Sequence, residues 1–542
     1  MNRGKRALIL ILLFCLVSIF ACRKSTPTWD TQILAPLVKT SLSINNLVTN
    51  TSVKVNPADS FVTLVYSDSL YSLNMDSLLK IPDTTLVNQI PSAPTTVLPG
   101  GALPLPAPTG PTQYKTGSVE LTNAIIKSGY VKVSVSSYLT QPTDYTYSVP
   151  SATLGGNPLN VVVKVPAGNA TTPATKDTFY DLSGYTVDFT GPMHNGNNLI
   201  TTSISGIVDP SGGTLVISAF NPNGVTITAT FYNIIPYYGQ GYFGQITKSI
   251  GPSQASFPLF KNISSGILDL NDVTVNFTLE NGFGVDARAF ISQLTSINSR
   301  PGGTNFPLTA SIINNAININ RATQTYNPLS PVTPSIKTFN LTPNNSDILK
   351  WVDNMPTSIG YGIQITTNPP PIGNEGFTDF AFYGQGIKAY FDISVPLNIA
   401  ANNLTLQDTT PVSFANSSQA KQIKSGTFSI YATNMFPFSA GLQIYILDNN
   451  MHITDSLCAS PQLIYAADTN YRGIVTIPKN SLIPITLNTN QANALFSAKN
   501  IIIKAVFNTG CTTCIGIKYS KIYSTYQLNI KLVGNFDYQV KG

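Results

Sequence analysis

The sequence is poor in charge. Asp, Glu, Lys and Arg make up only 10% of its 542 residues, whereas soluble globular domains average about 25%. Hydroxyl and amide side chains, glycine, proline and tyrosine take their place, a composition typical of β proteins outside the cytoplasm. Because 42% of the residues are hydrophobic, the chain can bury real cores and is not a disordered protein.

Positive charge is also too scarce to indicate nucleic-acid binding. The formal net charge is +6, but Arg3, Lys5 and Arg6 lie in an N-terminal leader. The rest of the chain has 28 basic and 25 acidic residues, without a long run of either sign. We therefore expect no nucleic-acid partner.

Catalytic motifs are missing. The two histidines, His194 and His452, stand alone in loop-like contexts. The sequence contains no H-E-x-x-H, G-x-S-x-G, P-loop or dinucleotide-binding pattern. We therefore expect no metal, no cofactor and no enzymatic activity, although two well-placed carboxylates would be enough for a glycan hydrolase.

Cysteine is scarce as well. Of five cysteines, Cys511 and Cys514 form a C-x-x-C motif between two strand-like runs. Two distant histidines cannot complete a zinc site there, and no helix follows the motif as in thioredoxin-like proteins. We expect a disulfide that closes a hairpin tip in an oxidising compartment. We expect Cys458 to be a buried single thiol.

The N-terminus carries an apolar run. Residues 1–22 have the pattern of a secretory leader, with a positive start and an apolar stretch from Ala7 to Phe20 that is short for a membrane span. The leader ends in Ile19-Phe20-Ala21-Cys22, which resembles the lipobox of bacterial lipoproteins. This resemblance implies that Cys22 becomes the first residue and carries a diacylglycerol. An ordinary cleaved leader is the alternative.

No acidic residue follows Cys22 directly. Surface-exported lipoproteins of the Bacteroidota often carry an acidic stretch there, whereas this chain has Arg23-Lys24-Ser25-Thr26-Pro27. We therefore expect a lipid anchor in the outer membrane and leave open whether the protein faces the periplasm or the cell surface.

Five Asp-Ser/Thr triplets resemble the O-glycosylation sequon of Bacteroidota envelope proteins. The hydroxyl residues that this resemblance marks are Ser69, Ser77, Thr84, Thr409 and Ser456. Chance in a chain rich in serine and threonine is the alternative explanation.

Strand patterns fill the chain after the leader. Residues 23–86 contain several strand-like runs and are expected to form an N-terminal β segment. Residues 87–114 are rich in proline, which lacks a backbone donor and fixes φ. We therefore expect a linker or a long loop there rather than a central strand.

One unit recurs, made of a strand, a break of Asn, Gly or Pro, and a second strand. It covers residues 215–232, 273–291 and 428–446. Alternation with period two predicts half-buried antiparallel strands, and we expect the breaks to be hairpin turns. The tetrapeptide Ile-Lys-Ser-Gly occurs at 126–129 and 423–426, each time before such a strand-rich unit. These repeats indicate duplicated β-sandwich modules.

We expect an all-β fold of several antiparallel β-sandwich modules in tandem. The expected modules are 115–250, 251–395 and 396–542. One short helix is expected near 346–355, because apolar residues share one face of it and Pro356 stops it.

An aromatic cluster stands out in a glycine-rich stretch. It contains Tyr237, Tyr238, Tyr242 and Phe243. Such rings can stack on sugar faces or meet an apolar partner, so these residues are candidates for ligand or partner contact. Packing between strands is the alternative.

Two resemblances complete the sequence evidence. The recurring unit is similar to small late-embryogenesis-abundant (LEA14/WHy-like) β-sandwiches. The whole chain resembles a family of Bacteroidota outer-membrane lipoproteins that begin with Cys, a Trp-Asp pair (Trp29-Asp30) and an L-x-x-I-P-D-T segment (Leu78–Thr84). The second resemblance implies an envelope location and brings no activity with it.

We therefore expect a lipid-anchored, non-catalytic envelope protein, a structural or binding component that contacts another envelope protein or a glycan. A carrier with a β groove for lipid or another hydrophobic ligand is the second hypothesis. A glycan-acting hydrolase is the third.

Overall fold

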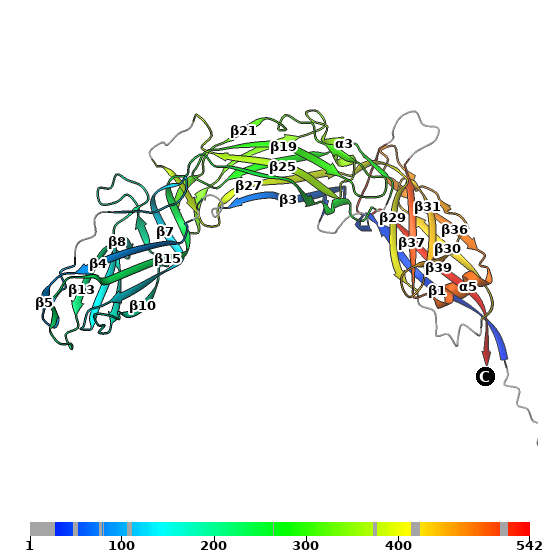
Figure 1. Cartoon of the computed structure of the whole chain (residues 1–542). Helices are drawn as coiled ribbons and strands as arrows, with labels where there is room; N and C mark the ends of the chain where they lie inside the picture. Colours follow the sequence, from blue (N-terminus) through cyan, green and yellow to red (C-terminus); the bar gives the residue numbers. More distant parts are fainter. Residues whose placement is uncertain are drawn as a thin grey trace, which may run out of the picture.

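Three β modules follow one another along an arch. The computed structural model describes residues 28–46, 52–74, 79, 81–105, 111–263, 265–371, 377–412, 423–509 and 519–541. Figure 1 shows the distal module around β7 and β15, the middle module around β19 and β25, and the proximal module around β30 and β39, where the chain ends. Nearly all elements are antiparallel strands, so the expected all-β class is confirmed.

The modules are nested in the chain, because their first strands come in the reverse order of their last strands. β1 (Thr28–Ser43) pairs with β39 (Gln527–Lys541) in the proximal module. β3 (Val62–Asn74) pairs with β27 (Gly386–Pro396) in the middle module. Residues 28–74 therefore give strands to two different modules and do not form an N-terminal segment of their own.

The distal module is the innermost insertion. Its first strand β4 (Thr84–Ser92) pairs with its last strand β15 (Asn221–Tyr242). The chain thus runs out along the arch from β1 to β4, folds the distal module, and returns through the middle module to the proximal one (Figure 1).

All three modules share one strand order in their first sheet. The orders are β4-β15-β7-β10, β3-β27-β18-β24 and β1-β39-β30-β36. The further strands are β7 (Glu120–Ser137), β10 (Ala174–Asp181), β18 (Thr274–Asn281), β24 (Ser335–Leu341), β30 (Ile423–Asn434) and β36 (Lys479–Ile485). The two Ile-Lys-Ser-Gly tetrapeptides lie in β7 and β30, which hold the same place in this order. The sequence repeat is therefore also a structural repeat.

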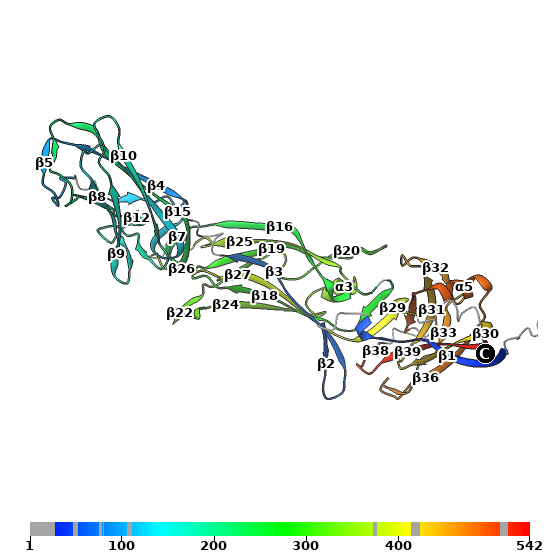
Figure 2. The same ribbon diagram turned by 90° about the horizontal axis from the view of Figure 1, so that it is seen from below.

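A second layer of strands accompanies the first sheet in each module (Figure 2), and in the middle and proximal modules this layer is a separate sheet. In the middle module it is formed by β16 (Thr247–Ser256), β25 (Ser358–Thr367), β19 (Ala287–Ile297) and β21 (Ala316–Ile319). In the proximal module it is formed by β29 (Leu404–Pro411), β37 (Asn500–Asn508), β31 (Ser439–Leu447) and β33 (Gln462–Ile464). In the distal module β8 (Thr143–Leu154) pairs with β9 (Asn157–Val165) and β13 (Ser203–Val208), and β11 (Thr186–Asp188) joins them to β7, so both layers belong to one nine-stranded sheet.

The breaks in the recurring units are corners between the two sheets, and the expectation of hairpin turns was wrong. β18 and β19 belong to opposite sheets, as do β30 and β31, and β14 (Leu215–Ile217) does not pair with β15. Period-two alternation is the same in a hairpin and in a corner, so the pattern alone could not separate them.

A buried asparagine fixes two of these corners. The Asn281 side chain accepts a hydrogen bond from the Phe283 N–H (3.0 Å) and donates to the carbonyls of Val285 and Asn320 (both 2.8 Å). Asn434 repeats this pattern with the Phe436 N–H and with the carbonyls of Phe438 and Tyr465. Both asparagines are fully buried. Each side chain therefore supplies the hydrogen bonds that these backbone groups would otherwise make with water.

The proline-rich stretch is more ordered than a linker. Residues 87–92 lie in β4, and β5 (Thr95–Val97) and β6 (Thr112–Gln113) follow. β4 pairs with β15 alone and is an edge strand. An edge tolerates Pro91, because its missing N–H faces no second partner.

Two α-helices occur in the described residues. α3 (Ile348–Asp353) confirms the expected helix, and it buries Ile348, Trp351 and Val352. α5 (Thr489–Ser497) was not expected, yet it precedes β37 just as α3 precedes β25. Its start carries a complete capping box between Asn488 and Gln491, a sequence signal of a helix N-terminus.

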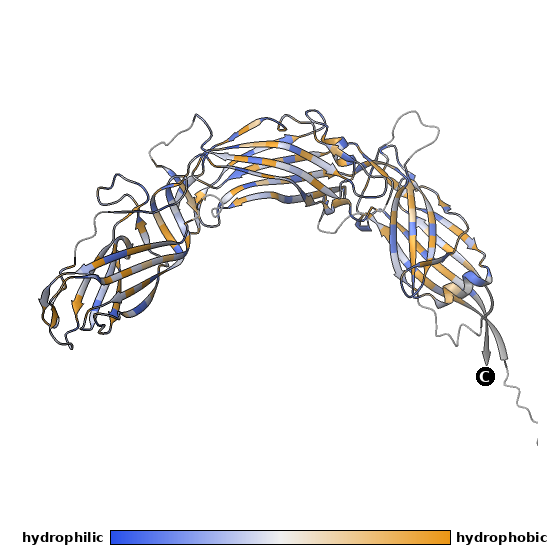
Figure 3. Ribbon diagram, in the orientation of Figure 1, coloured by the Kyte–Doolittle hydropathy of each residue, from blue (hydrophilic) through white to orange (hydrophobic). Residues whose placement is uncertain are grey.

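Buried and exposed residues alternate along the strands, and polar and apolar residues alternate along the ribbons in the same way (Figure 3). The middle and proximal modules share one continuous core. This core also takes in distal residues next to the middle module, such as Leu121, Ala124 and Phe189, whereas the rest of the distal module has a core of its own. A third, small cluster of Tyr238, Ala322, Val332, Phe380 and Phe382 lies at the junction between the distal and middle modules.

Candidate functional site

The aromatic cluster found in the sequence lies at this junction. Tyr238 packs 4.7 Å from the ring of Phe382 on β26 (Asp379–Phe382), and Tyr237 meets the same ring edge-on at 5.9 Å. Phe243 is fully buried, and Tyr238 is only 8% exposed. These two rings hold the modules together and leave no surface for a partner, while Tyr237 and Tyr242 are half-buried.

A buried ion network lies beside the cluster. The Asp379 carboxylate accepts hydrogen bonds from the Phe243 N–H (2.9 Å), the Asn368 side chain (2.6 Å) and Arg321 (3.2 Å). Arg321 also pairs with Asp286 at 3.1 Å. Burial raises the pKa of Asp379, although these partners oppose the rise. Because every charge here has a partner, the network fixes β15 to the middle module and offers no free carboxylate for catalysis.

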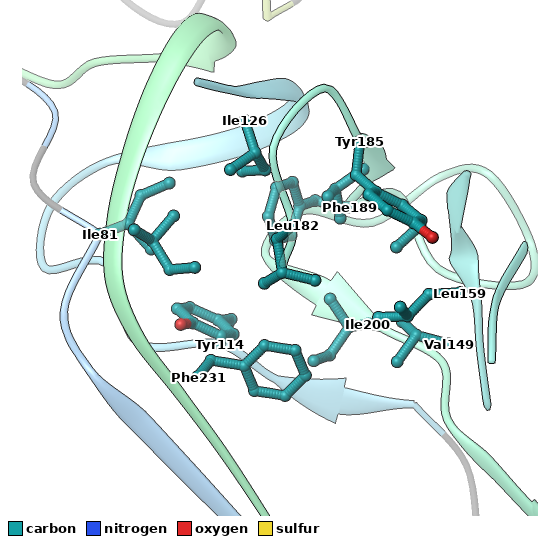
Figure 4. Close-up of a pocket in the computed structure, with 13 residues that line it drawn as sticks. Ile81, Tyr114, Ile126, Val149, Leu159, Leu182, Tyr185, Phe189, Ile200 and Phe231 are labelled. Carbon is teal, nitrogen blue, oxygen red and sulfur yellow. The ribbon is translucent and has the colours of Figure 1, made fainter. Parts of the chain in front are cut away.

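The cavity in Figure 4 is too small for a lipid. It lies in the distal module between Tyr114, Leu159, Leu182 and other apolar side chains, and its volume is about 40 Å³. Small-molecule sites usually occupy about 300–1,000 Å³. This cavity therefore does not support the carrier hypothesis.

A larger hollow of about 800 Å³ lies on the surface where the chain passes between the modules. Leu79 and residues 81–83 border one side, and residues 233–236 border the other. The Asn233 N–H donates to the Asp83 carboxylate at 3.0 Å, which ties the two sides together. With polar groups on its rim, the hollow is the seam between two connecting segments and not an enclosed apolar site.

The outer face of the distal sheet carries a different group of rings. Tyr130 on β7 and Tyr232 on β15 are cross-strand partners, and their rings stack at 5.9 Å with 29° between the planes. In the next row Lys132 lies beneath the Phe179 ring (5.7 Å) and pairs with Asp177 (2.8 Å). Tyr130 is 45% exposed and Phe179 61%, so both rings are open to solvent.

Hydroxyl groups fill the rest of this face, which we call the distal outer face. They alternate along β7, β15, β10 and β4 with the buried residues of the core, and they belong to Ser134, Ser136, Thr226, Thr228, Thr230, Thr175 and Thr85. Thr85 and Thr230 are hydrogen-bonded across the strands at 3.2 Å. A flat face with open rings, hydroxyls and a paired charge can stack on sugar rings and hydrogen-bond their hydroxyls.

Sequence reasoning missed the distal outer face. Its signal is the run Tyr130-Val-Lys-Val-Ser-Val-Ser136, in which aromatic and polar residues alternate with buried valines. The alternation was visible, but Phe179 lies 47 positions away from Lys132 in the sequence. Only the pairing of β10 with β7 brings it next to Tyr130.

Both histidines lie on exposed turns. His194 Nδ1 is 3.1 Å from Asp188, and His452 Nδ1 is 3.5 Å from Asp448. In the part of the chain that the structure describes, no group of three His, Cys, Asp or Glu residues is placed to hold a metal ion.

The candidate modification sites differ in accessibility. Ser69 and Thr409 are exposed. Thr84 and Ser456 are half-buried, and their hydroxyls donate to the carbonyls of Pro82 and Cys458. Ser77 lies outside the described residues.

The cysteines add one observation. Cys458 is a buried free thiol, as expected, and burial raises its pKa. Cys22, Cys511 and Cys514 lie outside the described residues, so the anchor and the disulfide stay predictions. None of the described helices is long and apolar enough to cross a membrane.

Comparisons with known proteins give distant likeness only to solved structures. No protein-family model matches the sequence, and a search of curated proteins gives no match. Among solved structures, the chain is similar to a "putative secreted protein" from Parabacteroides distasonis, with 9% identity and a TM-score of 0.30, over 93% of this chain and 99% of that chain. A TM-score this low carries no argument, so the LEA14-like resemblance also stays a prediction.

Proposed function

We propose that this protein is a lipid-anchored, non-catalytic binding protein of the outer membrane, held by Cys22, that presents its distal outer face to a glycan. The observation that supports the proposal most is the open pair of rings, Tyr130 and Phe179, on a face otherwise made of hydroxyls. Its place in the nested fold adds to the argument.

The nested order separates the anchor from this face. β1 and β39, the first and last strands, are both in the proximal module. Cys22 precedes β1 by six residues, a length that spans at most about 20 Å. An anchored chain would therefore keep its proximal module at the membrane and extend the distal module away from it (Figure 1).

A glycan fits the distal outer face better than a charged partner does. Lys132 and Asp177 neutralise each other, and the neighbouring rows carry rings, hydroxyl groups, an amide, the apolar Val87 and a single further carboxylate, that of Asp181 opposite Tyr130. Ring faces with neighbouring hydroxyls match the alternating apolar and hydroxylated surfaces of a sugar ring.

The test is a glycan array with the mature chain carrying Cys22→Ser, which removes the acyl anchor but keeps all modules. We expect binding to at least one neutral polysaccharide. Tyr130→Ser with Phe179→Ser should weaken it at least tenfold, because stacking on an aromatic ring contributes about 1 kcal/mol or more per ring. The matched control is Tyr471→Ser, which removes an 89% exposed ring from the proximal module.

Three outcomes would contradict this proposal. The array shows no binding, the control variant loses as much as the face variant, or the face variant instead loses an envelope protein that copurifies with the wild type. Incorporation of labelled palmitate tests the anchor separately, and it should occur in the wild type and fail with Cys22→Ser.

A further inference from the structure

Charge is distributed unevenly between the two ends of the arch. Residues 28–46 and 397–542, which supply the proximal module, contain 11 basic and 6 acidic residues, a net charge of +5. Residues 47–396, which supply the other two modules, contain 15 basic and 19 acidic residues, a net charge of −4. The small positive net charge of the whole chain therefore combines a positive proximal module with a negative charge in the other two modules.

Part of this positive charge is concentrated on one sheet face. Lys39 on β1 and Lys531 on β39 are direct cross-strand partners, and the same row continues through Tyr431 on β30 to Leu482 on β36. Both lysines are exposed. Tyr431 is 45% and Leu482 60% exposed. We call these four residues the basic row.

The lysine pair is unfavourable within the protein alone. Like charges directly opposite each other in a sheet repel, and neither lysine forms an ion pair within the described part of the chain. Asp408, the carboxylate that reaches β1, instead accepts hydrogen bonds from the hydroxyls of Thr40 and Thr410.

Neighbouring rows do not relieve the repulsion. The next row along the sheet contains Ser41, Asn529, Thr433 and Asn480, all uncharged. A lysine on an edge strand prevents pairing with the strand of another chain, which explains Lys39 on β1. This does not explain Lys531, because β39 lies between β1 and β30 inside the sheet.

We propose that the basic row binds the anionic phospholipid headgroups of a membrane surface. The lysines would neutralise headgroup phosphates, while Tyr431 and Leu482 enter the interface beside them, where an amphipathic ring and an apolar side chain are both favourable. The row belongs to the module that holds both described chain ends, and Lys39 lies on the strand that follows residue 22 most closely in the sequence. It would supply the second membrane signal that stable anchoring by acyl chains requires.

This inference is independent of glycan binding and of acylation. It is therefore tested on the mature chain with Cys22→Ser, by cosedimentation with vesicles of phosphatidylcholine alone or with 30% phosphatidylglycerol. We expect binding to the anionic vesicles that decreases as salt rises. Lys39→Gln with Lys531→Gln should weaken it about tenfold or more, at roughly fivefold per lysine near a charged surface.

Two further variants sharpen the result. Tyr431→Ser with Leu482→Ser should weaken binding at low and high salt alike, because it removes the apolar contact. Lys115→Gln with Lys176→Gln removes the same charge from exposed positions of the distal module and should bind like the wild type.

The inference is overturned if neutral and anionic vesicles bind equally, if neither binds, or if the distal control loses as much as the basic-row variant. An unchanged melting temperature of the Lys39→Gln, Lys531→Gln variant shows that it is folded. Glycan binding by the same variant separates a failure of this inference from a failure of the proposed function.

Discussion

The distal module differs from the other two although all three share a strand order. The middle and proximal modules have a buried asparagine at the corner between their sheets, a helix before the next strand, and one shared core. Most of the distal module packs around a core of its own, and only its residues nearest the middle module, such as Leu121 and Phe189, join the shared core. At the equivalent corner, between β7 and β8, the distal module has the buried Ser137 in place of an asparagine, and its hydroxyl accepts a hydrogen bond from the Leu139 N–H at 3.3 Å. The same strand order thus occurs in two modules that share a core and in a third module, the distal one, that packs more independently.

The two junctions nevertheless use one local device. Asn233 and Asn403, where the chain leaves the distal and middle modules, both have φ of +54°. Opposite them lie Gly129 and Gly266, where any Cβ would collide with the backbone of the asparagine or of the residue after it. The two junctions therefore share the same asparagine–glycine contact. They differ in how the cores on either side of this contact are packed.

The largest expected effect is at the distal junction. Asp379→Ala leaves Arg321 partly unpaired and the Phe243 N–H without its acceptor, and breaking a buried ion pair costs about 3–5 kcal/mol. We expect amide hydrogen exchange in β26 and at the end of β15 to rise by about a hundredfold or more, with the distal core unchanged. Asp181→Ala, at an exposed turn, is the control. Unchanged exchange in β26 would show that the network does not hold the junction.

The next effect distinguishes the corners. Asn434→Ala removes the partner of one buried N–H and two buried carbonyls and should lower the free energy of unfolding by about 3 kcal/mol. Ser137→Ala, at the equivalent corner of the distal module, should cost about 1 kcal/mol, because it removes the acceptor of one buried N–H but no donor to buried carbonyls. Calorimetry measures both. Equal losses would mean that the corners are equivalent and that the comparison between the modules fails there.

A smaller effect depends on pH. Burial raises the pKa of Asp353, at the end of α3, to about 7, and Asp269 nearby adds to the rise. The folded state therefore binds a proton that the unfolded state releases near pH 4, so stability falls as pH rises from about 4 to 7. We expect the melting transition of the fused modules to drop between pH 5 and 8.

Asp353→Asn should flatten this dependence, because its amide oxygen can still accept from the Leu270 N–H without carrying charge. Each kcal/mol corresponds to about 2–4 °C in a unit of this size. The distal transition serves as the internal control. A drop of the same size there would assign the effect to other groups.

The sequence predicted the β class, the repeat and α3 because these depend on local patterns. The Ile-Lys-Ser-Gly tetrapeptides and the 348–355 periodicity are visible within a few residues. The nesting was not predictable, because alternation states which face of a strand is buried but not which strand lies beside it. For the same reason Tyr130 and Phe179 were not joined, whereas the capping box at Asn488 was a local signal that was overlooked.

The nested chain also sets an order in time. A chain that leaves the ribosome or crosses a membrane from its N-terminus completes its distal module once β15 is available, and its middle module once β27 follows. β1 must wait until nearly all of the remaining chain has arrived before β39 can cover it. The part closest to the proposed anchor is therefore the last to become structured, and loss of the final fifteen residues would leave a finished tip on an unfinished base.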